Sequence, residues 1–171
     1  MRRTLFENVT HRTVTEPPPP PDEAALRELA STVNRAARAR LGRSLSIRQV
    51  DAGSCNGCEL EIHALNNAFY DLERYGLHFV ASPRHADVLL VTGPVTKNMR
   101  EALGRTYNAT PDPKWVVAVG DCAASGGLFA GSYAVTGGVK DVVPVDLHIQ
   151  GCPPSPSKLL SALITLLGET S

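Results

Sequence analysis

The residues of this sequence best suited to do chemistry are its four cysteines: Cys55, Cys58, Cys122 and Cys152. The first two form a Cys-x-x-Cys pair, whereas Cys122 follows Cys58 by 64 residues and Cys152 follows Cys122 by 30. Cysteine thiolates bind soft metals, and an iron–sulfur cubane needs four of them, one for each iron. Because the chain contains four, we consider a single metal site that uses them all.

The elements that must position these cysteines are short apolar runs alternating with helical segments. We expect strands at 46–50, 77–81, 87–91, 115–119 and 142–149, and helices at 22–43, 59–75, 97–107 and 155–167. The runs Val88–Val91 and Val116–Val119 are apolar without alternation, as strands covered on both faces are. Alternating strands and helices predict an α/β fold with a doubly wound, mostly parallel sheet.

Each cysteine follows a predicted strand closely. Cys55 and Cys58 come after the strand 46–50, and Cys122 and Cys152 each lie three residues beyond a later strand. The loops at the carboxyl ends of parallel strands converge on one edge of the sheet, where ligands bind at the switch point of strand order. We therefore expect all four thiols to meet at this edge. Glycines beside them let backbone N–H groups approach a sulfur-rich anion.

Two other uses of four cysteines stay open at this point. Zinc modules usually contain two Cys-x-x-Cys pairs with a short spacer, whereas this chain has one pair and two separate cysteines. Two disulfides would require an oxidising compartment. Arg2 and Arg3 could begin an export signal, but the apolar stretch of such a signal is missing after them. We expect no signal peptide, and hence metal binding rather than disulfides.

Length and composition fit a globular chain. The 171 residues suit one core, with an expected division into a Pro-rich arm (1–22), an N-terminal helix (23–45) and the main domain (46–171). The arm is either a disordered tail or an extended segment along a partner. Lys plus Arg equals Asp plus Glu, 17 each, so the chain has no net positive charge that would attract nucleic acid. No apolar run reaches the roughly 20 residues of a transmembrane segment.

Four motifs carry a resemblance to a known family: Cys55–Glu61 (CNGCELE), Val91–Thr96 (VTGPVT), Gly120–Gly127 (GDCAASGG) and Gly151–Pro154 (GCPP). In order and spacing they resemble the small subunit of [NiFe] hydrogenases and the homologous B-type, 20 kDa subunit of NADH:quinone oxidoreductase (complex I). The resemblance covers about residues 46–167. It implies a flavodoxin-like fold and one [4Fe–4S] cluster, held by the four cysteines next to the active site of a large subunit.

The spacing of the first motif indicates a branch of this family. The complex I branch typically has adjacent cysteines here, whereas Cys55-x-x-Cys58 looks like energy-converting hydrogenases and formate hydrogenlyases. This resemblance implies three kinds of partner: a large catalytic subunit, a ferredoxin-like iron–sulfur subunit and membrane subunits. It also implies a peripheral location on the cytoplasmic face of the membrane and an oxidoreductase role that is not catalytic alone. A complex-I-like quinone oxidoreductase is the alternative, followed by a zinc-stabilised assembly module.

Some glutamate and histidine residues near the cysteines have more than one open interpretation. Glu59 and Glu61 follow Cys58 and are candidates to surround the metal ligands. Glu61 lies where complex I relatives carry a glutamate, so it either faces the large subunit, moves protons, or only favours a helix N-terminus. His63 and His148 either tune the cluster or are structural or exposed residues.

Overall fold

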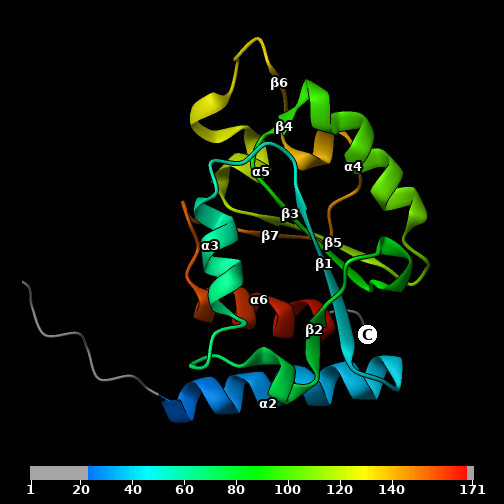
Figure 1. Ribbon diagram of the computed structural model, residues 1–171, viewed down its shortest axis with the longest axis vertical. Helices are drawn as coiled ribbons and strands as arrows, with labels where there is room; N and C mark the ends of the chain where they lie inside the picture. The colour runs from blue at the N-terminus through cyan, green and yellow to red at the C-terminus, as the bar shows by residue number, and fades with distance from the viewer. Residues whose placement is uncertain (1–22, 169–171) are drawn as a thin grey trace, which may run out of the picture.

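A five-stranded parallel sheet forms the centre of the computed structural model, which describes residues 23–168 (Figure 1). Its strands are Leu45–Asp51 (β1), Leu77–Phe79 (β2), Val88–Thr92 (β3), Trp115–Val119 (β5) and Leu147–Ile149 (β7). They lie in the order β2-β1-β3-β5-β7, and every neighbouring pair is parallel. This is the 2-1-3-4-5 strand order of flavodoxin-like folds, which confirms the predicted class.

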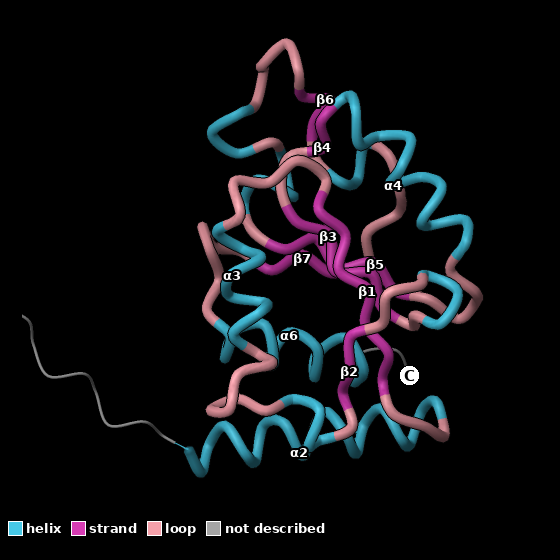
Figure 2. Tube along the Cα trace, viewed as in Figure 1, coloured by secondary structure: helices cyan, strands magenta, loops and turns pink. Residues whose placement is uncertain are grey.

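Helices cover both faces of this sheet (Figure 2). One face packs against Glu23–Leu41 (α2), Gly57–Ala64 (α3) and Pro156–Gly168 (α6), and the other against Lys97–Ala109 (α4) and Asp121–Ser125 (α5). Short 3-10 turns occupy Leu72–Tyr75 (η1), Pro83–His85 (η2), Gly127–Phe129 (η3) and Val139–Asp141 (η4). Val95–Thr96 (β4) and Val135–Gly137 (β6) form a small antiparallel pair beyond the sheet. Within residues 23–168, no helix has the length and apolarity to span a membrane.

The apolar strands bury side chains in two separate cores. In β3, Val88 and Leu90 join the core beneath α2, α3 and α6, whereas Leu89 and Val91 join the core beneath α4 and α5. All four side chains are at most 1% exposed. Successive residues of a strand point to opposite faces, so a strand covered on both faces needs apolar residues throughout. The apolar runs without alternation are therefore explained, as predicted, by coverage of these strands on both faces of the sheet.

Three predicted elements are shorter than expected, and the first two adjoin in the chain. The helix predicted over 59–75 ends at Ala64, because the Asn67 side chain accepts hydrogen bonds from the N–H groups of Phe69 and Tyr70, both at 2.9 Å. Asparagine competes in this way with the helical backbone. The chain then turns through η1 before β2, which ends at Phe79 instead of residue 81.

The strand predicted over 142–149 is reduced to Leu147–Ile149. The N–H groups of Val142 and Val143 both donate to the carbonyl oxygen of Val139 at 3.0 Å, which closes a turn instead of extending a strand. The β-branched residues of this segment pack in the core below α4 and α5 without joining the sheet. The apolar pattern of the sequence alone does not distinguish a strand that joins the sheet from a turn whose side chains pack in the core.

The N-terminal helix α2 lies beside α6 and buries Val33 and Ala37 against the sheet. It ends at Leu41, two residues before the predicted end at residue 43. Gly42 has a φ of 69°, and its N–H donates to the Arg38 carbonyl oxygen at 2.9 Å, which reverses the chain. The Pro-rich arm lies outside the described residues. The division into an N-terminal helix and a main domain at residue 45 stays a prediction. In the structure, α2 and α6 pack into one hydrophobic core.

An ion pair that is buried at Asp87 and half exposed at Arg43 joins the segment after α2 to the sheet at the amino ends of the strands. The Asp87 side chain is 4% exposed and accepts hydrogen bonds from the Arg43 guanidinium at 2.9 and 2.5 Å. It also accepts one from the backbone N–H of Ser46 at 2.9 Å. This carboxylate therefore holds α2, β1 and β3 together at one point.

We expect Asp87→Ala to lower the free energy of unfolding by about 2 kcal/mol or more, because it strands the buried Ser46 N–H and removes the ion pair. Urea unfolding of the full-length chain followed by circular dichroism measures this loss. Glu101→Ala is the matched control, because the Arg105–Glu101 pair is about three-quarters exposed on both sides and should contribute below about 0.5 kcal/mol. Equal losses in the two variants would contradict this account of the fold.

Candidate metal centre

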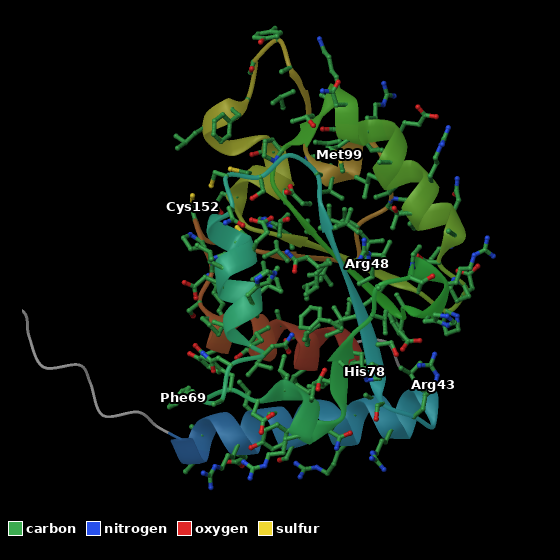
Figure 3. All side chains as sticks on the ribbon, viewed as in Figure 1. Arg43, Arg48, Phe69, His78, Met99 and Cys152 are labelled. Atoms are coloured by element: carbon green, nitrogen blue, oxygen red, sulfur yellow. The ribbon has the colours of Figure 1, made fainter. Side chains whose placement is uncertain are left out.

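All four cysteines line one cavity of about 140 Å³ at the carboxyl edge of the sheet. The remaining walls come from the segments after β1, β3, β5 and β7, so four stretches distant in sequence contribute to one place. Figure 3 shows sulfur atoms gathered near the labelled Cys152, on the opposite side of the molecule from Arg43. The strand order changes direction between β1 and β3, and the cavity lies beyond this switch point.

The cysteines differ in their local structure. Cys58 is the second residue of α3 and Cys122 the second residue of α5, so these two lie in helical first turns instead of the expected loops. Cys55 precedes α3, and Cys152 follows β7. Cys58 is buried, Cys122 is half-buried, and Cys55 and Cys152 are exposed. None of the four is in a disulfide. The cavity therefore has a deep side at Cys58 and a rim at the surface.

The segment between β1 and α3 is shaped by side-chain acceptors. One carboxylate oxygen of Asp51 accepts hydrogen bonds from the N–H groups of Gly53 (2.8 Å) and Ser54 (2.7 Å). The Ser54 hydroxyl oxygen accepts from the N–H of Asn56 at 3.1 Å, and the hydroxyl donates to Glu59 at 2.5 Å. These bonds fix the backbone around Cys55 within the protein itself. Sequence reasoning missed Asp51, although an aspartate two residues before a glycine can form a turn with the backbone of that glycine.

A second set of bonds joins the segments that carry Cys122 and Cys152. The N–H of Asp121 donates to the Gly151 carbonyl at 3.0 Å, and the Asp121 carboxylate accepts from the Gly151 N–H at 2.9 Å. Nε2 of His148 lies 3.1 Å from the carbonyl oxygen of Gly120. His148 thus contacts backbone, in keeping with its structural interpretation, while His63 is exposed on α3. Sequence reasoning also missed Asp121, because its partner lies 30 residues away.

Two glycines keep space open beside the sulfur atoms. Gly120 has φ = 87°, and a Cβ there would lie 2.7 Å from Sγ of Cys58. Gly127 has φ = 51°, and a Cβ there would lie 2.8 Å from Sγ of Cys122. Both separations are far below a normal carbon–sulfur contact, and both φ values disfavour other residues. Any larger residue would therefore push into the thiols.

The thiols oppose one another's ionisation. Burial raises the pKa of Cys58 to about 12, and the negative charge of Glu59 and the other three cysteines add to this effect. Burial and the nearby Cys152 raise the pKa of Cys122, while a hydrogen bond from the backbone N–H of Leu128 acts in the opposite direction. Four thiolates can therefore coexist here only with positive charge among them.

The donor set fits a thiolate-bound metal group. Over residues 23–168, no three His, Cys, Asp or Glu side chains are grouped so that they hold a single metal ion. The four thiols surround a cavity instead, and open space lies between them. Four sulfur donors suit an iron–sulfur cluster, with Cys55, Cys58, Cys122 and Cys152 as the residues that would hold it. Their role as ligands stays a prediction.

The two glutamates after Cys58 are placed differently. Glu59 is 5% exposed and contacts the Cys55 segment through Ser54, whereas Glu61 is half-buried on the next part of α3. Leu60, between them, is 61% exposed. The first turn of α3 therefore directs one carboxylate inward and an apolar side chain outward.

Two curated proteins are similar to this chain over about three-quarters of its length. The chain is 46% identical over 129 residues to formate hydrogenlyase subunit 7 of Escherichia coli K12, which covers 75% of this chain and 51% of that protein. It is 45% identical over 127 residues to the probable membrane-bound hydrogenase subunit mbhJ of Pyrococcus furiosus, covering 74% and 76% of the two chains. The chain thus spans about half the length of the Escherichia coli relative.

A solved structure shares the fold. A chain of the membrane-bound sulfane sulfur reductase, an archaeal respiratory membrane complex, superposes with a TM-score of 0.65 at 35% identity, covering 80% of this chain and 73% of that one. The family model described as NADH ubiquinone oxidoreductase, 20 Kd subunit, matches residues 55–166, a region that holds all four cysteines. The chain therefore belongs to the 20 kDa subunit family of NADH–ubiquinone oxidoreductase.

Proposed function

We propose that this chain is the electron-transfer subunit of a membrane-associated, hydrogenase- or formate-hydrogenlyase-like complex, and that it carries one [4Fe–4S] cluster on Cys55, Cys58, Cys122 and Cys152. The observation that carries the proposal is the single cavity lined by all four thiols. The family and the relatives named as hydrogenase and formate hydrogenlyase subunits support it.

The chain's own residues would bind the cluster and shape the cavity around it. When bound, the cluster supplies a one-electron carrier whose potential depends on hydrogen bonding, burial and nearby charge. Gly120 and Gly127 leave the space that the sulfur atoms need, and the Leu128 N–H donates toward Cys122. The subunit is not catalytic alone in this proposal; the reaction belongs to the large subunit.

An apolar surface beside the cysteines supports a partner at this edge. Among the described residues, three exposed large apolar side chains lie close to the cysteine segments, and Leu128 is 90% exposed: Leu60, Leu128 and Phe129. Leu60 lies two residues after Cys58, and the Leu128 backbone bonds Cys122. Exposed apolar patches mark interaction sites. We assign this surface to the large subunit.

The remaining parts of the proposal concern the assembly. A ferredoxin-like iron–sulfur subunit would deliver or accept electrons, and membrane subunits would hold the complex at the cytoplasmic face, with this chain peripheral. The described residues contain no helix able to span a membrane, which is compatible with that location. The membrane-bound complexes named for two similar proteins support it further.

A second candidate is the equivalent subunit of a complex-I-like quinone oxidoreductase. The observation in its favour is the matching family model, which is named for that enzyme. The Cys55-x-x-Cys58 spacing and the hydrogenase relatives favour the first candidate. A large-subunit partner with two Cys-x-x-Cys pairs would decide for hydrogenase-like chemistry. The zinc-stabilised module ranks third.

We expect the anaerobically purified chain or complex to contain about four irons and four sulfides in this subunit, with a [4Fe–4S] EPR signal on reduction. Cys122→Ala should lose or strongly destabilise the cluster, because only three thiolates remain. Iron and sulfide analysis with low-temperature EPR measures both. Stoichiometric zinc without iron would refute the cluster, and an unchanged spectrum in Cys122→Ala would remove that residue as a ligand.

Gly120→Ala should reduce the iron content at least severalfold, because its Cβ would collide with the Cys58 sulfur and its φ is positive. The matched control is Gly104→Ala in α4, where a Cβ meets nothing within 4 Å and helix propensity improves. Iron per folded chain, with circular dichroism as the measure of folding, compares the two variants. Full cluster content in Gly120→Ala would show that the close approach is not needed.

Leu128→Asp combined with Leu60→Ser should weaken the affinity for the large subunit at least tenfold, because these side chains are 90% and 61% exposed and lie on the segments of Cys122 and Cys58. The control is Phe69→Ser, an exposed aromatic residue that Figure 3 places well away from Cys152. Co-purification and the dissociation constant are measured at unchanged iron content. Equal retention of the partner by the double variant and the control would exclude this surface as the interface.

A further inference from the structure

A buried carboxylate beside the cysteines has almost no partners. Glu59 is 5% exposed, and its Oε1 is buried without a hydrogen-bond partner. Its Oε2 accepts one bond, from the Ser54 hydroxyl at 2.5 Å. No ion pair among the described residues involves this glutamate. Burying a carboxylate with so little compensation is unfavourable, so the position calls for a role other than stability.

Its position makes this charge effective at the candidate metal centre. Glu59 directly follows Cys58, the deepest of the four thiols, in the first turn of α3. The nearby carboxylates of Asp51 and Asp121 are exposed and accept backbone N–H bonds. Glu61 is only half-buried. Charge acts more strongly where water is excluded, so Glu59 dominates the negative field on the deep side of the cavity.

We propose that Glu59 sets the reduction potential of the cluster, acting as a fixed negative charge that favours the oxidised state. This inference rests on the function proposed above. Reduction adds one electron from the donor to the cluster and neither forms nor breaks a bond. The added negative charge is repelled by a nearby carboxylate, so the charge of Glu59 lowers the potential.

A purely structural role for Glu59 predicts something different. The Asn56 N–H donates to Ser54, and the Ser54 hydroxyl donates to Glu59, so the carboxylate also anchors the start of α3. Glutamine has the same shape and still accepts the Ser54 bond, but carries no charge. Glu59→Gln therefore separates the electrostatic role from the anchoring role.

The experiment is an EPR-monitored redox titration of the full-length chain reconstituted anaerobically with iron and sulfide. Four variants are compared with the wild type: Glu59→Gln, Glu59→Asp, Ser54→Ala and Glu61→Gln. At the wild-type midpoint, Glu59→Gln should raise the ratio of reduced to oxidised cluster about tenfold, which is a positive shift of about 59 mV for one electron. Glu59→Asp keeps the charge and should stay near the wild type. Ser54→Ala and Glu61→Gln should change the ratio much less than Glu59→Gln.

Each other outcome has a defined meaning. A Glu59→Gln midpoint no different from that of Glu61→Gln overturns the inference and leaves the proposed function intact. If Glu59→Gln fails to retain the cluster, retention at the wild-type potential by Glu59→Asp supports the charge, whereas loss in both variants overturns it in favour of packing. A wild-type chain that takes up no iron–sulfur cluster overturns the proposed function and this inference together.

Discussion

Mutual repulsion of four thiols in one small cavity is the constraint on which the functional end of this molecule depends. The pKa of Cys58 rises to about 12 through burial, Glu59 and the other cysteines, so the protein alone opposes the ionised state that a metal needs. Binding of the proposed cluster would therefore displace protons and bring positive charge. The Leu128 N–H and the open space at Gly120 are arranged to accommodate charged sulfur, and they have no evident value for a neutral pocket.

Stability and chemistry are separated along the strands. At the amino ends, Asp87 binds Arg43 and the Ser46 backbone, and this ion pair fixes α2 to the sheet. At the carboxyl ends, the carboxylates of Asp51 and Asp121 accept hydrogen bonds from backbone N–H groups of the cysteine segments. The sheet between these ends is apolar on both faces and holds them in register. Because the stabilising contacts lie at the other end of the strands, they can offset unfavourable features of the site, such as a buried glutamate with few partners.

The surface around the site has a consistent character. The deep side carries Cys58 and Glu59, and the rim carries exposed cysteines together with the nearby apolar Leu60 and Leu128. An electron carrier needs short distance to its redox partner and protection from water, and a covered apolar rim provides both. The segment with η3 and β6 extends beyond the sheet in Figure 1, where it is available to a partner. In the proposed function, a partner subunit that covers this edge would complete the site.

The sequence by itself determined the parts of this protein that depend on local pattern and on residue type. Unalternating apolar runs identified β3 and β5, and the spacing of four cysteines after strands indicated one common edge. Only the tertiary structure decided where α3 ends, how short β7 is and that Cys122 lies in a helix. It also decided that Asp121 pairs with Gly151 and that Glu59 is buried with one oxygen unpartnered. These features arise from contacts between residues far apart in the chain and from competition between side-chain and backbone hydrogen bonds, which a local pattern does not encode.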